Sequence, residues 1–225
     1  GVDRIIALDL HSPGQEVALT FDGTVPVESI SSNELMADYF AELDPPLGDQ
    51  VVVIAANTNC VKKSVKFKES LAKRRDFKIL DTAIFFKGSS GIGTKADDAE
   101  SEFIGSDVQG ADVIIVDNIL VEGKTLSKLC RRLSMDGARR IFMCSNHGVF
   151  SPTAMKLVDL SPVERVVVTN SVPLPPTSSS KVVQTDTTRL FAKVISSELC
   201  RGDDEFKTVI PTLVDEDETE ELHEE

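Results

Sequence analysis

The sequence predicts an α/β protein with a parallel sheet and helices on both faces. Short apolar runs rich in β-branched residues recur along the chain, and most are followed by a segment with the period of an amphipathic helix. Strands that alternate with helices form right-handed βαβ units, whose helices cover both faces of the sheet. Ligands of such sheets bind at the carboxyl ends of the strands.

The positions of the elements follow from these patterns. Strands are expected at 4–10, 51–56, 78–80, 113–117, 140–145 and 165–169. Helices are expected at 33–43, 60–74, 125–135, 153–160 and 187–199. The glycine- and serine-rich stretch 87–95 and the proline-containing stretch 173–180 are typical of loops.

Composition limits the classes of function. At 225 residues and 41% hydrophobic content the chain can fill a core, and its net charge is -13. Residues 215–225 hold eight acidic and no basic side chains, which leaves -5 for the rest. A negative body argues against nucleic-acid binding, because phosphate backbones need clustered lysine and arginine.

The predicted helix 60–74 is an exception to the net negative charge, because it carries a cluster of basic residues. We interpret it as a solvated helix face rather than a nucleic-acid surface. Its members are Lys62, Lys63, Lys66, Lys68, Lys73, Arg74 and Arg75.

The cysteines indicate a reducing compartment. Cys60, Cys130, Cys144 and Cys200 show no CxxC spacing, which favours reduced and mostly buried thiols. No apolar stretch approaches membrane-spanning length, and the N-terminus lacks the pattern of a signal peptide. We therefore expect a soluble, cytoplasmic protein with no membrane partner. Because it begins at Gly1, we expect a processed or partial chain.

The segment 113–126 predicts a buried strand, a short loop and the start of a helix. Gly123 permits a tight turn, and Thr125 opens a helix that runs to about Met135. Backbone N–H groups at such a helix start bind phosphate. The sequence Gly123-Lys124-Thr125 imitates the end of a Walker A loop, but Asn118 stands where its first glycine belongs. A phosphate site and a plain connection remain equally open at this point.

Eight short blocks, each weak alone, occur in a characteristic order between residues 1 and 200. They are Asp9-Leu10-His11, 21–27, 51–54, Val116-Asp117, Gly123 with Thr125, 137–142, 147–151 and 166–174. In this order they resemble the ribose-phosphate pyrophosphokinase family, also called phosphoribosyl pyrophosphate synthetases. The resemblance implies a type I phosphoribosyltransferase fold.

The resemblance also implies an activity and a set of site residues. Members transfer the diphosphate of Mg-ATP to the anomeric hydroxyl of ribose 5-phosphate, and Mg²⁺ bridges the phosphate oxygens. His11 and Asn57 match metal-site positions. Residues at substrate-binding positions are Asp117, Gly123, Lys124 and Thr125. No residue is assigned to catalysis.

Several of these positions depart from the family pattern. Asn57 replaces an aspartate and brings no charge to a hard cation. Asn118 replaces a second acid, Val121 cannot hydrogen-bond a ribose hydroxyl, and Glu122 places a carboxylate beside the phosphate. Lys124 can partly compensate for that carboxylate. The family's Lys-Arg-Arg cluster is replaced by 81–86, whose apolar part we interpret as core or interface packing.

The resemblance implies a domain organisation as well. Family members have a homologous N-terminal half that is not in this chain, so 1–28 is expected to complete that half. Residues 29–202 are expected to form the phosphoribosyltransferase-like domain, and 203–225 a disordered acidic tail. Without the missing half, apolar surface around 5–10 should be exposed or covered by another chain.

Two functional hypotheses follow. The chain is either a divergent member or part of an active ribose-phosphate pyrophosphokinase, or a non-catalytic regulatory or structural subunit. In either case we expect a homo- or hetero-oligomer with synthetase chains. A different phosphoribosyltransferase-fold enzyme fits the order of the blocks less well. We predict that the 225-residue chain alone makes no phosphoribosyl pyrophosphate.

Overall fold

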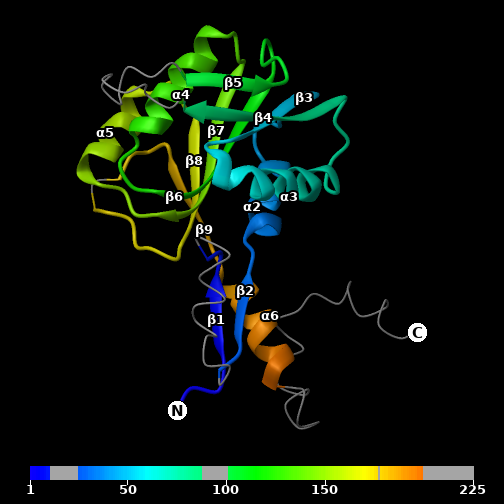
Figure 1. The fold of residues 1–225 in the computed structure, drawn as a ribbon, viewed down its shortest axis with the longest axis vertical. Coiled ribbons are helices and arrows are strands. Elements are labelled where there is room, and N and C mark those ends of the chain that lie inside the picture. The colour runs from blue at the N-terminus through cyan, green and yellow to red at the C-terminus, as the bar shows by residue number, and fades with distance from the viewer. Residues whose placement is uncertain (11–24, 88–100, 177, 200–225) are drawn as a thin grey trace, which may run out of the picture. The chain divides into compact units, whose positions relative to one another are not determined.

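The computed structural model describes residues 1–10, 25–87, 101–176 and 178–199 (Figure 1). The chain divides after Thr185 into two compact units. The first unit carries the sheets, and helix α6 (Thr188–Leu199) belongs to the second.

Within the residues that the structure describes, the main sheet has seven strands and is parallel except at one edge. In spatial order they are β5 (Ser101–Gly105), β4 (Ile79–Lys87), β3 (Gln50–Ala55), β6 (Asp112–Leu120), β7 (Arg140–Gly148), β8 (Arg165–Thr169) and β9 (Val182–Thr185). Only β5 runs antiparallel to its neighbour, β4. The expected sheet is thus confirmed as mostly parallel.

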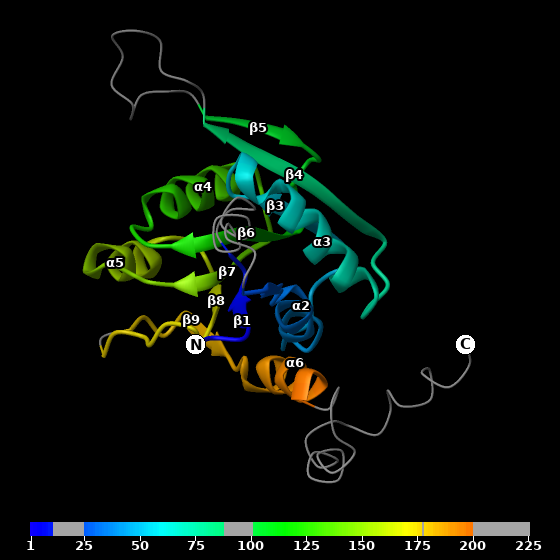
Figure 2. The same cartoon turned by 60° about the horizontal axis from the view of Figure 1, so that its bottom comes forward.

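Helices cover both faces of this sheet (Figure 2). On one face, α2 (Asn33–Ala41) and α3 (Val61–Ala72) pack against Ile114 and Val116 of β6. On the other, α4 (Lys124–Met135) and α5 (Pro152–Leu160) pack against Val113 and Ile115. Because successive strand residues point to opposite faces, the unbroken apolar run of β6 contributes side chains to the hydrophobic cores on both faces of the sheet.

Strand β1 (Ile5–Leu8) stands outside the main sheet. It pairs in parallel with β2 (Val27–Ile30) in a sheet of two strands. Ile5 and Ile6 are half-buried, whereas Leu8 is 8% exposed. Apolar surface therefore remains accessible on β1 in this chain. The expected domain boundaries at 28 and 202 stay predictions.

Several elements differ from those expected. Strands β2, β5 and β9 were not predicted, because each is only four or five residues long and lacks an extended apolar run. Strand β4 extends to Lys87 rather than ending at Leu80, and β6 continues past Asp117 to Leu120. A 3₁₀ turn, η1 (Thr58–Cys60), precedes α3. Of the loop expected over 87–95, Lys87 is the last residue of β4, and the remainder lies outside the described residues, as does the acidic tail.

Within the described ranges, no helix combines the length and the apolar character needed to cross a membrane.

Candidate functional site

A cleft of about 480 Å³ lies at the carboxyl ends of β3 and β6, where the β1–β2 sheet and the start of α3 also meet. Its lining includes two carboxylates, Asp9 and Asp117, and three lysines, Lys62, Lys63 and Lys66. This is the end of a parallel sheet at which ligands bind.

Asp117 is held in the cleft by weak donors. Its Oδ1 accepts from Asn57 Nδ2 at 3.5 Å, from the Cys60 thiol at 3.4 Å and from the Asn118 backbone N–H at 2.8 Å. The carboxylate is half-buried. The described contacts of Asp117 include no arginine or lysine within ion-pair distance, so its charge is available to a ligand.

Asn57 lies beside Asp117 as the family pattern predicts, but its amide is already engaged. Its Oδ1 accepts from Asn59 N at 2.9 Å and so caps the 3₁₀ turn η1. Its amide nitrogen faces Asp117, and nitrogen of an amide is not a ligand of Mg²⁺. The metal-binding role of Asn57 stays a prediction, and His11 lies outside the described residues.

The turn after β6 has the geometry that Gly123 was expected to supply. Gly123 has φ 73°, and a Cβ there would lie 3.2 Å from the Cα of Ala154. It precedes the first turn of α4, which no side chain caps, so N–H groups of that turn can bind an anion.

The side chains of this turn are open to solvent. Lys124 Nζ lies 3.8 Å from Glu122 Oε2, with both side chains about 70% exposed. Lys124 lies close enough to Glu122 to compensate for part of its charge, although solvent screens so exposed a pair, and Thr125 is exposed on the first turn. Among the four predicted substrate-binding residues, Asp117 lines the cleft, and the others form the turn that follows β6.

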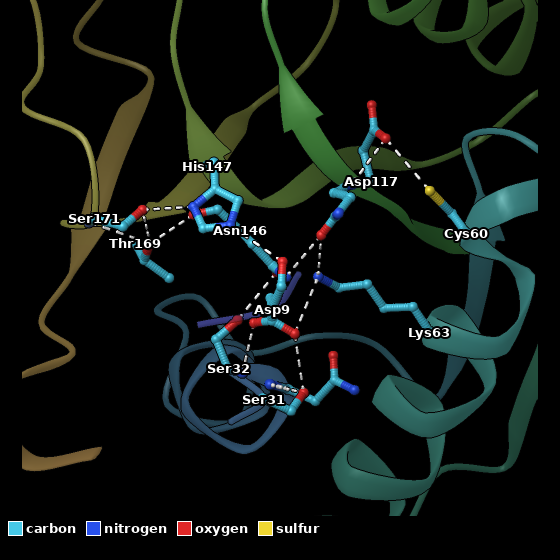
Figure 3. A network of polar contacts seen from close by, with 12 residues as sticks. Asp9, Ser31, Ser32, Cys60, Lys63, Asp117, Asn146, His147, Thr169 and Ser171 are labelled. Atoms are coloured by element: carbon cyan, nitrogen blue, oxygen red, sulfur yellow. Dashed lines mark hydrogen bonds and ion pairs between the residues drawn. The ribbon is translucent and has the colours of Figure 1, made fainter. Parts of the chain in front are cut away.

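Lys63, like Asp9, is a cleft residue that was not among the predicted site residues. Its side chain is only 16% exposed, and its Nζ lies 3.9 Å from Asp9 Oδ1 and 3.4 Å from Asn118 Oδ1 (Figure 3). Burial lowers the pKa of Lys63, while the carboxylates of Asp9 and Asp117 act in the opposite direction. The prediction of a solvated face was wrong for Lys63, although Lys62 and Lys66 are exposed.

Asp9 connects the β1–β2 sheet to this cleft. It follows β1 with φ 44°, a left-handed conformation that is uncommon for residues other than glycine. Its Oδ2 accepts from Ser32 N at 2.8 Å and its Oδ1 from Ser31 Oγ at 3.3 Å. Two hydrogen bonds and the contact with Lys63 thus fix the carboxylate toward the cleft.

Strand β7 contributes two polar residues, Asn146 and His147, to the hydrogen-bond network beside the cleft (Figure 3). The buried Asn146 accepts from Ser32 Oγ at 3.0 Å and donates to Asn118 Oδ1 at 3.1 Å. His147 Nε2 lies 3.3 Å from the Asp9 carbonyl, and its Nδ1 lies 2.8 Å from Ser171 Oγ. Because a carbonyl only accepts, Nε2 carries the proton in this contact.

The thiols near the cleft are not nucleophiles. Burial raises the pKa of Cys60 to about 12, with Asp117 adding to the shift, and burial raises the pKa of Cys144 to about 12. These shifts keep both thiols protonated at pH 7, whereas the thiolate is the form that attacks or binds metal. Cys60, Cys130 and Cys144 are free and buried, as expected, and Cys200 lies outside the described residues.

A metal-binding group is not found in the part of the chain that the structure describes. There, no three or more His, Cys, Asp or Glu side chains are placed to hold one metal ion. Asn57 directs its oxygen to a backbone N–H, and Lys63 places an ammonium group beside the Asp9 carboxylate. These residues do not fit a divalent cation held by the protein.

Comparison with known proteins identifies the family. The sequence pattern of the phosphoribosyl synthetase-associated domain matches residues 96–199. Ribose-phosphate pyrophosphokinase 1 of Listeria monocytogenes is 31% identical over 175 residues, which are 78% of this chain and 50% of the relative. This chain belongs to the ribose-phosphate pyrophosphokinase family. The comparisons do not favour the alternative of a non-catalytic subunit.

Further members agree in sequence and fold. Ribose-phosphate pyrophosphokinase of Caldanaerobacter subterraneus is 31% identical over 196 residues, 87% of this chain and 57% of the relative. The crystal structure of phosphoribosylpyrophosphate synthetase from Mycobacterium smegmatis matches the fold with a TM-score of 0.70. It is 22% identical, and the match covers 90% of this chain and 60% of that chain. The chain thus spans about half the length of the curated family members it matches.

Proposed function

We propose that this chain is part of a ribose-phosphate pyrophosphokinase and binds ribose 5-phosphate at the carboxyl end of β6. The whole enzyme would transfer the diphosphate of Mg-ATP to that sugar for nucleotide biosynthesis. The proposal rests on the order in which three structural features follow one another along β6 and the start of α4. Asp117 lines the cleft, and the strand then turns at Gly123 into an uncapped helix start.

Each feature suits one part of ribose 5-phosphate. The Asp117 carboxylate accepts hydrogen bonds from ribose hydroxyls, and its present donors are weak enough to be exchanged. The N–H groups of the first turn of α4, together with the exposed Thr125 hydroxyl, bind the phosphate. The ion pair of Glu122 with Lys124 lowers the repulsion that the phosphate meets there.

The proposal assigns the binding of Mg²⁺ and ATP to the whole enzyme. We propose that Mg²⁺ enters with ATP as Mg-ATP, because the described residues do not hold a cation themselves. ATP would be bound with the help of further synthetase chains in an oligomer. We propose a cytoplasmic location for this enzyme, because free, buried cysteines are typical of proteins in a reducing compartment.

Calorimetric titration of ribose 5-phosphate into the 225-residue chain tests the proposal. We expect saturable binding that Asp117→Ala weakens at least about tenfold, the loss of a charge-assisted contact. Glu164→Ala is the matched control, since it removes an exposed acid just before β8, at the other end of the strands. Equal affinities in wild type and Asp117→Ala would contradict the proposal.

A further inference from the structure

The cleft contains a cation that belongs to the protein itself. Lys63 Nζ lies 3.9 Å from Asp9 Oδ1 and 3.4 Å from Asn118 Oδ1, and Asp117 also acts on it electrostatically. Asp9 comes from the end of β1, whereas Asp117 and Asn118 come from β6. The ammonium group of Lys63 therefore lies between the carboxylate of Asp9 and the amide oxygen of Asn118, which are far apart in the sequence (Figure 3).

Helix packing fixes the inward direction of Lys63. Phe67 follows it by one helical turn on the same face of α3 and is 1% exposed, and Leu71, one turn further, is fully buried. Rotating α3 to release Lys63 would expose both side chains. The ammonium group is consequently a fixed part of the cleft, unlike the exposed Lys62 and Lys66.

The charges of the cleft favour an anion over a divalent cation. Three ammonium groups, of Lys62, Lys63 and Lys66, outnumber the two carboxylates of Asp9 and Asp117. A divalent cation near Asp9 would have to displace Lys63 from its oxygen contacts, in a cleft that Lys62 and Lys66 also line. A phosphorylated sugar, in contrast, gains from the excess positive charge.

We propose that the ammonium group of Lys63 replaces a protein-bound divalent cation in this cleft, so that the cleft binds a phosphorylated sugar without added metal. Lys63 supplies the positive charge together with N–H donors for oxygen atoms of the sugar. The identity of the sugar phosphate rests on the proposed function, whereas the exclusion of the metal ion does not.

Two binding measurements on the 225-residue chain test this inference. The first is the affinity for ribose 5-phosphate in EDTA and in Mg²⁺, for wild type, Lys63→Met and Lys73→Met. The second is Mn²⁺ binding by electron paramagnetic resonance on the same proteins without sugar. Lys73→Met is the matched control, because Lys73 is exposed at the other end of α3.

We expect wild type and Lys73→Met to bind the sugar with affinities that differ less than about twofold between EDTA and Mg²⁺. Lys63→Met should lose at least about tenfold in EDTA and recover part of that loss in Mg²⁺. Mn²⁺ should bind Lys63→Met at least about tenfold more tightly than wild type, because the Asp9 carboxylate is then left without its ammonium partner and the positive charge near Asp117 is removed.

Two results would overturn the inference: sugar binding by wild type that requires Mg²⁺, or equal Mn²⁺ affinity of wild type and Lys63→Met. If no protein binds ribose 5-phosphate, the proposed function fails, and the Mn²⁺ comparison still decides the role of Lys63. If Lys63→Met does not fold, the wild-type comparison between EDTA and Mg²⁺ decides it.

Discussion

The two ends of strand β6 carry an aspartate each, and their surroundings differ. At the start, Asp112 is fully buried and accepts from Arg139 Nε at 2.7 Å, from Arg140 Nη2 at 2.6 Å and from Gly48 N at 2.8 Å. At the other end, Asp117 is half-buried and accepts from an amide, a thiol and one N–H. Strong, complete partners indicate a structural carboxylate, and weak, exchangeable partners indicate a ligand site.

Arg140 connects the Asp112 end of β6 to the neighbouring loop before β3. Besides Asp112, its guanidinium donates to the carbonyls of Pro45 and Pro46 at 3.0 and 2.8 Å. Through these partners, the buried carboxylate of Asp112 connects the start of β6, the start of β7 and the loop before β3. Removing it affects all three segments together.

The largest expected effect is on folding stability at this end. Asp112→Ala should lower the free energy of unfolding by about 3–5 kcal/mol, because it leaves the 14%-exposed Arg140 without its partner. Asp117→Ala is the matched variant and should cost less than about 1 kcal/mol, since it removes two long contacts and one hydrogen bond from the adjacent Asn118 N–H. Urea unfolding followed by circular dichroism measures both. Similar losses would remove the distinction between the two ends.

A smaller effect is expected at the turn after β6. Gly123→Ala should destabilise by about 1–3 kcal/mol, because φ 73° is strained for alanine and its Cβ would press on Ala154. Gly110 has φ 72°, and a Cβ there would meet nothing within 4 Å, so Gly110→Ala isolates the backbone strain. The difference in unfolding free energy between the two variants measures the contact with Ala154. If that difference is zero, the turn has room to adjust and does not depend on close packing.

The sequence predicts the main sheet well and the cleft only in part. Runs such as Val113–Val116 predict central strands because burial on both faces demands continuous apolar residues. The strand end at Asp117 and the turn at Gly123 could be placed from the sequence because both have local signatures, whereas their substrate-binding roles stay predictions from the family resemblance. Lys63 could not be placed in this way, because its helix carries several lysines and only the packing of α3 decides which one turns inward. Likewise the partners of Asp112 come from the distant residues 48, 139 and 140, which no local pattern joins.

The smallest expected effect concerns the pH dependence of stability and the Asp112 end of β6. Burial by itself would raise the pKa of Asp112, but hydrogen bonds from Arg140, Arg139 and Gly48 outweigh it and hold the pKa below its usual range. A carboxyl whose pKa is lowered on folding contributes stability above its unfolded pKa of about 4. That contribution is lost as the pH falls through the lower folded value.

Wild type should therefore lose unfolding free energy below about pH 4 more steeply than Asp112→Asn, which has no carboxyl to titrate at this position. Urea unfolding at a series of pH values between about 3 and 7 measures both slopes. Other carboxylates contribute equally to the two proteins, so their difference isolates Asp112. Parallel slopes would show that the arginine contacts of Asp112 do not stabilise its charged form.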